Sequence, residues 1–258
     1  MNDQSELERQ REHFDKIASR YYSGRQKRNH IRFKENMWVY YFKDKAFLKS
    51  KRRVLEAMCG YAEGKTILEK YLGSKMDYTG FDYSLELINK VKKYSPEIHV
   101  IHSDITRFEA SNKFDLIILL GGLHHVPGHV QAAITNLHSV MERGGYFINF
   151  EPTHNNMIYK IIRDKIYKSN SLFDEQTEDA FKLDILNKYF IDNGFQMVDQ
   201  IYPGLLSYIL YYNPDAFPYL NIGGVKMVDA IFNIEKWAYS TRFAKLLSFA
   251  TLTLWKKI

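Results

Sequence analysis

The feature that most constrains this chain is a regular alternation of short apolar runs with segments of helical length between residues 53 and 151. The runs are rich in aliphatic and aromatic residues and have the length of strands. We expect five strands, at 53–57, 78–82, 98–102, 114–120 and 146–151. Apolar residues recur every three or four positions in the helices expected at 65–72, 85–94 and 130–141.

Strands that alternate with helices predict parallel pairing with right-handed crossovers. The run "LIILL" at 116–120 is apolar throughout, as in a central strand covered by helices on both faces. The length of 258 residues is sufficient for one sizeable core. The predicted fold class is therefore α/β, with a doubly wound and mostly parallel sheet.

Composition narrows the setting of this fold. Cys59 is the only cysteine, so no intrachain disulfide can form, and no apolar leader precedes Glu6 and Arg9. We therefore expect a cytoplasmic protein. The longest apolar stretch, 116–126, is interrupted by glycines and histidines and is shorter than the ~20 residues of a membrane helix.

The net charge of +6 is concentrated at the N-terminus. Residues 1–53 hold 15 Lys and Arg against 7 Asp and Glu, and the rest of the chain holds 21 against 23. Such an excess fits a solvated face, and it also fits contact with an anionic substrate or a membrane surface.

The stretch "VLEAMCGYAEG" at 54–64 follows the first predicted strand. In a doubly wound sheet, ligands bind at the carboxyl ends of the strands, where this turn must lie. Gly60 allows a positive φ or close approach of a ligand, and Gly64 can loosen the start of the next helix. A tight turn without a ligand is the alternative.

Two acids follow the next two strands. Asp82 ends "YTGFD", about twenty residues after the glycine turn, where a carboxylate can accept hydrogen bonds from both hydroxyls of a ribose. Asp104 in "HSDI" can accept a hydrogen bond from an adenine amine. Each site could also be a helix cap, because Ser84 and Asp104 stand at plausible helix starts. Together the acids predict a site for a nucleoside.

The ordered series "VLEAMCGYAEG", "YTGFDYS", "HSDI", "FDLIILLGGLHHV" and "RGGYFINFEP" resembles the class I S-adenosylmethionine-dependent methyltransferases over about residues 50–155. The segment "HFDKIASRYY" at 13–22 is similar to the N-terminal segment that folds over the cofactor in many members. The family loop usually reads acid-x-Gly-x-Gly-x-Gly. Glu56 and Gly60 match it, whereas Met58 and Ala62 replace the first and third glycines.

The resemblance implies a seven-stranded sheet and S-adenosylmethionine as the cofactor, which carries no phosphate. Glu56 would lie near the cationic sulfonium. The resemblance places Glu56 and Gly60 at the methionine part, Asp82 at the ribose, Asp104 and the Ile105 amide at the adenine, and the Leu120 and Gly121 backbone at the methionyl amine. The other positions that we expect to bind the cofactor are Ala57, Met58 and Tyr83, with Tyr21 and Tyr22 closing the pocket.

The implied chemistry is an in-line displacement, in which positioning alone can contribute up to ~7–11 kcal/mol. A base is needed only if the acceptor starts protonated. His124 and His125 follow the fourth strand, and Glu151 and His154 follow the fifth, so the three histidines are candidate bases. We place His124 first. Capping or hydrogen bonding to buried backbone is the alternative role for each.

A metal site is not expected. The histidines at 124, 125, 129 and 154 follow no zinc spacing, and two neighbouring histidines in one loop point apart.

Beyond residue 155 we expect helices at 156–168 and 177–193, with Gly194 in the left-handed position after the second. Strands at 195–202 and 249–257 would form the antiparallel edge that the resemblance implies. The domains we predict are a helical cap over the cofactor at 1–50 and a methyltransferase domain at 51–258, with a substrate-binding insert at about 203–248.

The insert is dense in aromatic side chains: Tyr208, Tyr211, Tyr212, Phe217, Tyr219, Phe232 and Trp237. These could line a pocket for a ring-containing acceptor, pack in a homodimer, lie on a bilayer as a peripheral contact, or simply fill the core. The substrate-contacting residues we predict are Glu151, Tyr208 and Tyr212.

The predicted function is methylation of a small organic acceptor, such as a natural-product, quinone-like, glycan or lipid intermediate. An RNA methyltransferase is the first alternative, favoured by the basic N-terminus and a pI near 9.1. Against nucleic acid, the loop after the fourth strand lacks the Asn/Asp-Pro-Pro-aromatic pattern that holds a flipped base. The second alternative is a scaffold that binds the cofactor without catalysis, for which Met58 and Ala62 are the best support.

Overall fold

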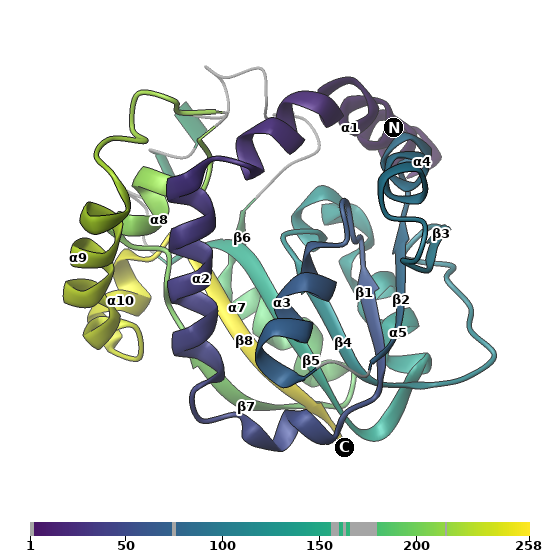
Figure 1. Ribbon diagram of the computed structural model, residues 1–258. Helices are drawn as coiled ribbons and strands as arrows, with labels where there is room; N and C mark the ends of the chain where they lie inside the picture. Colours follow the sequence, from purple (N-terminus) through teal and green to yellow (C-terminus); the bar gives the residue numbers. More distant parts are fainter. Residues whose placement is uncertain (1–2, 74–75, 156–159, 162–163, 166–179, 215) are drawn as a thin grey trace.

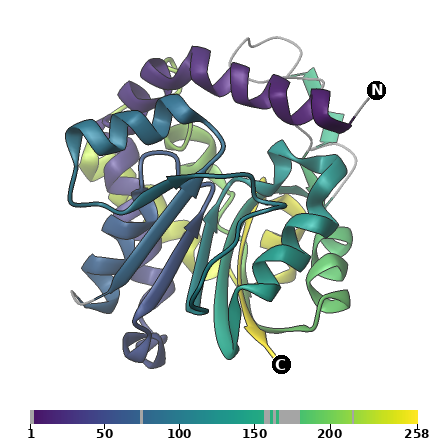
Figure 2. The same ribbon diagram turned by 90° about the vertical axis from the view of Figure 1, so that its right-hand side faces the viewer.

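The structure is a computed structural model that describes residues 3–73, 76–155, 160–161, 164–165, 180–214 and 216–258 (Figure 1). The chain begins with two long helices, α1 (Asp3–Arg25) and α2 (Arg28–Phe42), and a short 3-10 helix, η1 (Ala46–Ser50). Helix α1 crosses above the carboxyl ends of the parallel strands in both Figure 1 and Figure 2. The N-terminal segment is therefore helical, as predicted, and lies over the edge where a ligand would bind.

The sheet has the order β3-β2-β1-β4-β5-β8-β7, with only β8 antiparallel to its neighbours. Its strands are β1 (Arg53–Ala57), β2 (Asp77–Asp82), β3 (Val100–His102), β4 (Phe114–Leu120), β5 (Met141–His154), β7 (Phe195–Ile201) and β8 (Ala250–Lys257). The strand order reverses between β1 and β4, where doubly wound sheets bind ligands. The predicted mostly parallel α/β sheet is confirmed.

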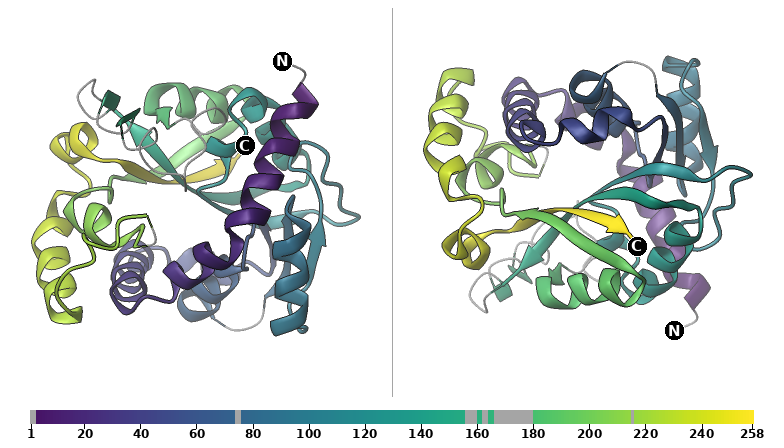
Figure 3. Two further views of the ribbon diagram at one scale, coloured as in Figure 1. Left: turned by 90° about the horizontal axis from the view of Figure 1, so that it is seen from above. Right: turned by 90° about the horizontal axis from the view of Figure 1, so that it is seen from below.

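Helices cover both faces of the sheet (Figure 3). The crossover helices are α3 (Glu63–Leu72), α4 (Leu85–Tyr94), α5 (Val130–Ser139) and α7 (Leu183–Asp192). Strand β4 sends Leu116 and Ile118 into one buried cluster and Ile117 and Leu119 into the other. Because alternate side chains enter opposite cores, the run is apolar at every position, as expected for a central strand.

Several predicted boundaries shift in the structure. The predicted helix at 177–193 begins only at Leu183, because Phe181 and Lys182 form strand β6 and pair with Thr153 and His154 of β5. Residues 177–179 and most of the helix predicted at 156–168 lie outside the described residues. Gly194 follows α7 with a φ of +80°, as predicted.

The insert between β7 and β8 is helical, as predicted. It contains α8 (Leu206–Tyr211), α9 (Val225–Glu235), the 3-10 helix η4 (Lys236–Ala238) and α10 (Arg242–Leu247). It packs against α2, where Arg32 donates two hydrogen bonds to Asp229, at 2.6 and 2.9 Å. Within the described part of the chain, no helix is long and apolar enough to span a bilayer.

Candidate functional site

The loop between β1 and α3 keeps a left-handed backbone at three alternate positions. The φ values are +52° at Met58, +51° at Gly60 and +59° at Ala62. A side chain in this region costs about 1–2 kcal/mol, so glycine is the usual residue there. Met58 and Ala62 therefore hold the conformation that glycines would hold at the same positions. The two departures from the glycine pattern thus coexist with a left-handed backbone at both positions.

Glu56 lies beneath this loop and is buried. Its carboxylate accepts hydrogen bonds from the Gly64 and Lys65 amides, at 2.8 and 3.1 Å, and from the Tyr78 hydroxyl at 2.5 Å. Burial raises the pKa of Glu56 to about 7, against the effect of these donors. The carboxylate thus ties β1 to β2 and to the first turn of α3, a structural role that the sequence did not indicate. Contact of Glu56 with a sulfonium stays a prediction.

Gly64 has a different role from the predicted one. A Cβ atom at this position would lie 2.7 Å from the Glu56 Cδ and 2.8 and 2.9 Å from its two carboxylate oxygens. At such distances a side chain at position 64 would force the Glu56 carboxyl group to move from its hydrogen-bond donors. Gly64 therefore makes room for the buried Glu56 carboxylate at the start of α3, and it does not loosen the helix.

Asp82 connects the end of β2 to the same loop. One carboxylate oxygen accepts a hydrogen bond from the Gly60 amide at 2.8 Å, and the other accepts from the Ser84 amide at 2.9 Å. Burial raises the pKa of Asp82 from its usual value. Ser84 also caps α4 by accepting from the Leu87 amide at 3.2 Å, so the capping alternative holds for Ser84.

Asp82 and Asp104 line one pocket at the carboxyl ends of β2 and β3, as a nucleoside site requires. Asp104 also accepts hydrogen bonds from the amide and hydroxyl of Thr106, at 2.7 and 2.8 Å, which holds its carboxylate in place. The other lining residues are Arg11, Met58, Tyr83, Ser84, Ser103, Ile105, His125 and Val126.

Four of these lining residues were not among the predicted site residues: Arg11, Ser84, Ser103 and Val126. Arg11 comes from α1, more than seventy residues before Tyr83, and its guanidinium carbon lies 6.0 Å from the centre of the Tyr83 ring. Only the packing of α1 over the sheet reveals this contact. Ser103 and Val126 adjoin Asp104 and His125 in the sequence, so a wider window around the strand ends would have included them.

His124, in the loop after β4, and Glu151, on β5, form a buried pair. Nδ1 of His124 lies 2.9 Å from a Glu151 oxygen. The other Glu151 oxygen accepts from the Gly122 and Leu123 amides, both at 2.9 Å. With Nδ1 engaged by the carboxylate, Nε2 on the far side of the ring is directed away from Glu151. The pairing fixes the orientation of a histidine suited to act as a base.

Burial raises the pKa of Glu151 to about 8, although the backbone amides favour its charged form. Its carboxylate hydrogen-bonds to the loop after β4 and to Asn149, and the residue is buried. Glu151 therefore positions His124 and the loop. The predicted contact with a substrate stays a prediction.

The other two candidate histidines have different surroundings. The His125 ring lies 3.8 Å from that of His124, between ring centres, and lines the pocket that contains Asp104. Burial lowers the pKa of His125 well below its usual value. His154 is the last residue of β5, where it pairs with Lys182 of β6. The geometry thus favours His124 over both as a base.

The remaining predicted cofactor residues surround the loop ends. Ala57 is buried at the end of β1, and Gly121, with a φ of +69°, follows Leu120 at the end of β4. The Tyr22 ring packs on that of Tyr61 in the glycine loop, with 4.7 Å between centres. The side chain of Tyr21 is outside the described part of the structure.

Three aromatic residues, Phe150, Tyr208 and Tyr212, pack together near the loop that follows β4. We call them the aromatic wall. The two tyrosine rings are stacked 4.5 Å apart, and both meet the Phe150 ring edge-on. Phe150 precedes Glu151 on β5, and its carbonyl accepts a hydrogen bond from the Gly121 amide at 2.7 Å. Arg25 and Lys34 lie over the Tyr212 ring, at 5.9 and 5.6 Å from its centre.

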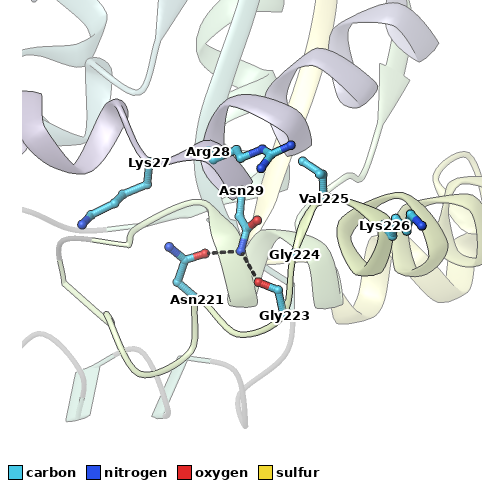
Figure 4. A pocket seen from close by; sticks show the side chains of 8 residues that line it. All are labelled: Lys27, Arg28, Asn29, Asn221, Gly223, Gly224, Val225 and Lys226. Atoms are coloured by element: carbon cyan, nitrogen blue, oxygen red, sulfur yellow. Dashed lines mark hydrogen bonds between the residues drawn. The ribbon is translucent and has the colours of Figure 1, made fainter.

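A second, basic pocket lies between the N-terminal ends of α2 and α9 (Figure 4). Asn29 connects the two sides of this pocket, because its amide donates hydrogen bonds to the Asn221 side chain at 2.8 Å and to the Gly223 carbonyl at 3.2 Å. The charged residues that line it, Lys27, Arg28 and Lys226, are all basic. Among the described residues, no cluster of three metal-ligating side chains is placed to hold a metal ion.

Comparison with known proteins agrees with this geometry. Residues 54–145 match the sequence model of a family described as "Methyltransferase domain". A demethylmenaquinone methyltransferase of Staphylococcus haemolyticus is 28% identical over 159 residues, which is 57% of this chain and 64% of the relative. A second, from Staphylococcus epidermidis, is 31% identical over 103 residues, covering 38% and 42% of the two chains. The chain thus spans less than two thirds of the length of these relatives.

Solved structures share the fold at low sequence identity. A SAM-dependent methyltransferase from Archaeoglobus fulgidus matches 91% of this chain and 96% of its own, with a TM-score of 0.57 and 18% identity. The [4+2]-cyclase SpnF matches 86% and 80%, with a TM-score of 0.57 and 14% identity. Because this fold serves both a methyltransferase and a cyclase, the reaction must be argued from the site.

Proposed function

We propose that this chain, which contains a methyltransferase domain of the class I fold, is an S-adenosylmethionine-dependent methyltransferase that acts on a small organic acceptor. The observation that carries the proposal is the single pocket that Asp82 and Asp104 share at the switch point of the sheet. Both acids stand at successive strand ends, and both are held by hydrogen bonds to nearby backbone.

The residues present fit an adenosyl group. Each Asp82 oxygen holds one backbone amide, which leaves lone pairs on both for the two ribose hydroxyls. Met58, Ile105 and Val126 provide apolar walls for an adenine ring, and Asp104 provides an acceptor for its amine. S-adenosylmethionine, once bound, would supply an electrophilic methyl group.

His124 would act as the general base for an acceptor that starts protonated. Glu151 engages its Nδ1, and Nε2 would be the nitrogen that takes the proton from the acceptor. In its ionised form, the buried Glu151 carboxylate would stabilise the imidazolium that results. We assign Glu151 the role of a positioning residue.

The acceptor we propose is a small ring-containing molecule, with a quinone-like ring as the first choice. Phe150, Tyr208 and Tyr212 pack together at the end of β5, and their rings are the aromatic surface we propose for such an acceptor. Phe150 precedes Glu151 on β5, so the two side chains point to opposite faces of the sheet. Relatives that match the sequence are named demethylmenaquinone methyltransferases, and this name supports the same choice. We also propose that the protein is located in the cytoplasm, which is consistent with its single buried cysteine. A homodimer is a further part of the proposal.

The scaffold alternative has lost its main support. Met58 and Ala62 suggested a damaged loop, yet both hold the left-handed conformation that the glycine loop needs.

The test is calorimetric titration of the chain with S-adenosylmethionine, its demethylated product and NAD. We expect the first two to bind and NAD to give no heat, because the loop lacks a glycine-rich site for a pyrophosphate. An Ile105→Arg variant should lose affinity for S-adenosylmethionine, because the longer charged side chain would occupy the apolar part of the pocket. Tyr94→Ser, at an exposed position on α4, should bind as the unmodified chain does. Absence of binding in the unmodified chain would refute the proposal. Transfer of labelled methyl to a hydroxynaphthoquinone then tests the acceptor class.

A further inference from the structure

Large apolar side chains are exposed along the outer side of the insert. Ile234 is 79% exposed, Trp237 81% and Phe243 65%. Leu206, Met227 and Leu246 of the same segment are also exposed. In a water-soluble monomer such side chains are usually scattered singly, so their concentration in four short helices, α8, α9, η4 and α10, indicates a partner.

The geometry of α9 explains why these side chains face outward. Val228, Phe232 and Glu235 form its buried side. At 100° per residue, Ala230 and Ile234 lie on the opposite side. Trp237 follows α9 in η4 and is 81% exposed. Figures 1 and 3 place α9 and α10 at the same outer edge of the molecule, away from β3. Phe243 and Leu246, three positions apart on α10, share one face of that helix.

The charges around this outer side are basic. Lys226, Lys236 and Arg242 lie on it, and the Lys236 ammonium stands 5.9 Å from the centre of the Trp237 ring. The acids of α9 are occupied elsewhere: Asp229 binds Arg32 and Asn36, and Glu235 binds the Tyr239 hydroxyl and the Ser207 amide.

The basic pocket continues this charge at the N-terminal end of α9. Within the described part of the chain, Lys27, Arg28 and Lys226 take part in no ion pair. The α9 helix has eleven residues and no acid in its first turn, so its positive end is not neutralised there. The α2 helix likewise has no acid in its first turn.

We propose that this outer side of the insert, with Ile234, Trp237 and Phe243 at its centre, binds the surface of an anionic phospholipid bilayer. Tryptophan, phenylalanine and aliphatic side chains enter the interface between headgroups and acyl chains, and Lys and Arg pair with lipid phosphates. A second copy of the chain fits less well, because two identical faces would bring like charges together.

This inference does not depend on the proposed catalysis, since a bilayer surface could be bound with an empty nucleoside pocket. The two can therefore fail separately. Titration with S-adenosylmethionine tests the pocket, and vesicle binding tests the insert.

The test uses intrinsic fluorescence, because the chain has three tryptophans and only one is exposed. Trp38 and Trp255 are each 1% exposed and Trp237 is 81% exposed. Vesicles of phosphatidylglycerol and phosphatidylcholine should shift the emission of Trp237 to shorter wavelength. Brominated acyl chains should quench it. Pure phosphatidylcholine vesicles should bind at least tenfold more weakly.

Variants separate the two components of binding. The triple variant Ile234→Ser, Trp237→Ser, Phe243→Ser should lower vesicle cosedimentation at least tenfold. Lys27→Gln with Lys226→Gln should weaken binding to anionic vesicles about tenfold and leave the neutral background unchanged. The control is Tyr94→Ser, Ile191→Ser, Val198→Ser, which removes three exposed apolar side chains from α4, α7 and β7 and should bind as the unmodified chain does.

Circular dichroism and thermal unfolding establish that each variant is folded. If anionic vesicles neither shift nor quench Trp237 in the unmodified chain, the proposal is wrong. A shift of Trp237 that depends on protein concentration, without lipid, and a dimer in sedimentation that the triple variant abolishes, would assign the face to a second copy instead.

Discussion

Gly64→Ala provides a sensitive test of the glycine loop, because two effects with opposite signs compete at this position. Gly64 lies in the first turn of α3, and replacing glycine with alanine in a helix normally stabilises it by up to about 1 kcal/mol. Here the added Cβ would lie 2.7 to 2.9 Å from the three terminal atoms of the Glu56 carboxyl group. The structure thus predicts that the substitution destabilises the protein.

The magnitude follows from what Glu56 would lose. Overpacking a buried site costs ~1–3 kcal/mol. A hydrogen bond to a charged group contributes ~1.5–3 kcal/mol, and the Gly64 and Lys65 amides both donate to this carboxylate. Displacing the carboxylate while keeping one of the two bonds, and allowing for the helical gain, gives a net loss of about 2–4 kcal/mol in the free energy of unfolding.

The assay is urea unfolding followed by the fluorescence of the buried Trp38 and Trp255. Gly60→Ala is the matched control: its φ is +51° and a Cβ would meet no atom within 4 Å, so only backbone strain of about 1–2 kcal/mol is expected. In a Glu56→Ala background, Gly64→Ala should become neutral or stabilising, because the carboxylate is gone. A stabilising effect of Gly64→Ala in the unmodified chain would refute the steric argument.

Three further predictions concern the site. His124→Gln should lower turnover by ~10²-fold or more while the affinity for S-adenosylmethionine changes less than a few-fold, since the base acts on the acceptor; equal turnover would remove His124 from the reaction. Burial raises the pKa of Glu151 from 4.5 to about 8, so the folded chain keeps a proton that the unfolded chain has lost, and the free energy of unfolding should fall as pH rises through this window. Glu151→Gln should flatten that fall in denaturant titrations at several pH values, and an unchanged slope would contradict the assignment. Ala62→Gly relieves a left-handed alanine but removes a buried methyl group and adds backbone flexibility, so it should change stability by less than ~1 kcal/mol. A much larger loss in calorimetric melting would contradict this balance of effects.

Local patterns were sufficient to predict the order of strands and helices. The period of apolar residues reports which side of an element is buried, and this signal lies within each segment. Asp82 and Asp104 could be assigned to one site because parallel strands all end at the same edge of the sheet, so position along the chain implies position in space. A local pattern also predicted Gly194 correctly, because glycine commonly takes the left-handed conformation after the end of a helix.

Contacts between distant segments were beyond such patterns. Glu56 occupies the space that a side chain at position 64 would need. Glu151 hydrogen-bonds to His124 because β5 lies beside the loop after β4. Strand β6 depends on the length of β5, which extends past its expected end to pair with Phe181. Trp237 is exposed although other aromatic residues of the insert are buried. The side of α9 that packs on α2 depends on the core and on the contact between Arg32 and Asp229, which are 197 residues apart in the chain. Burial is a property of the assembled fold, so the role of each of these side chains emerges only when the elements are packed together.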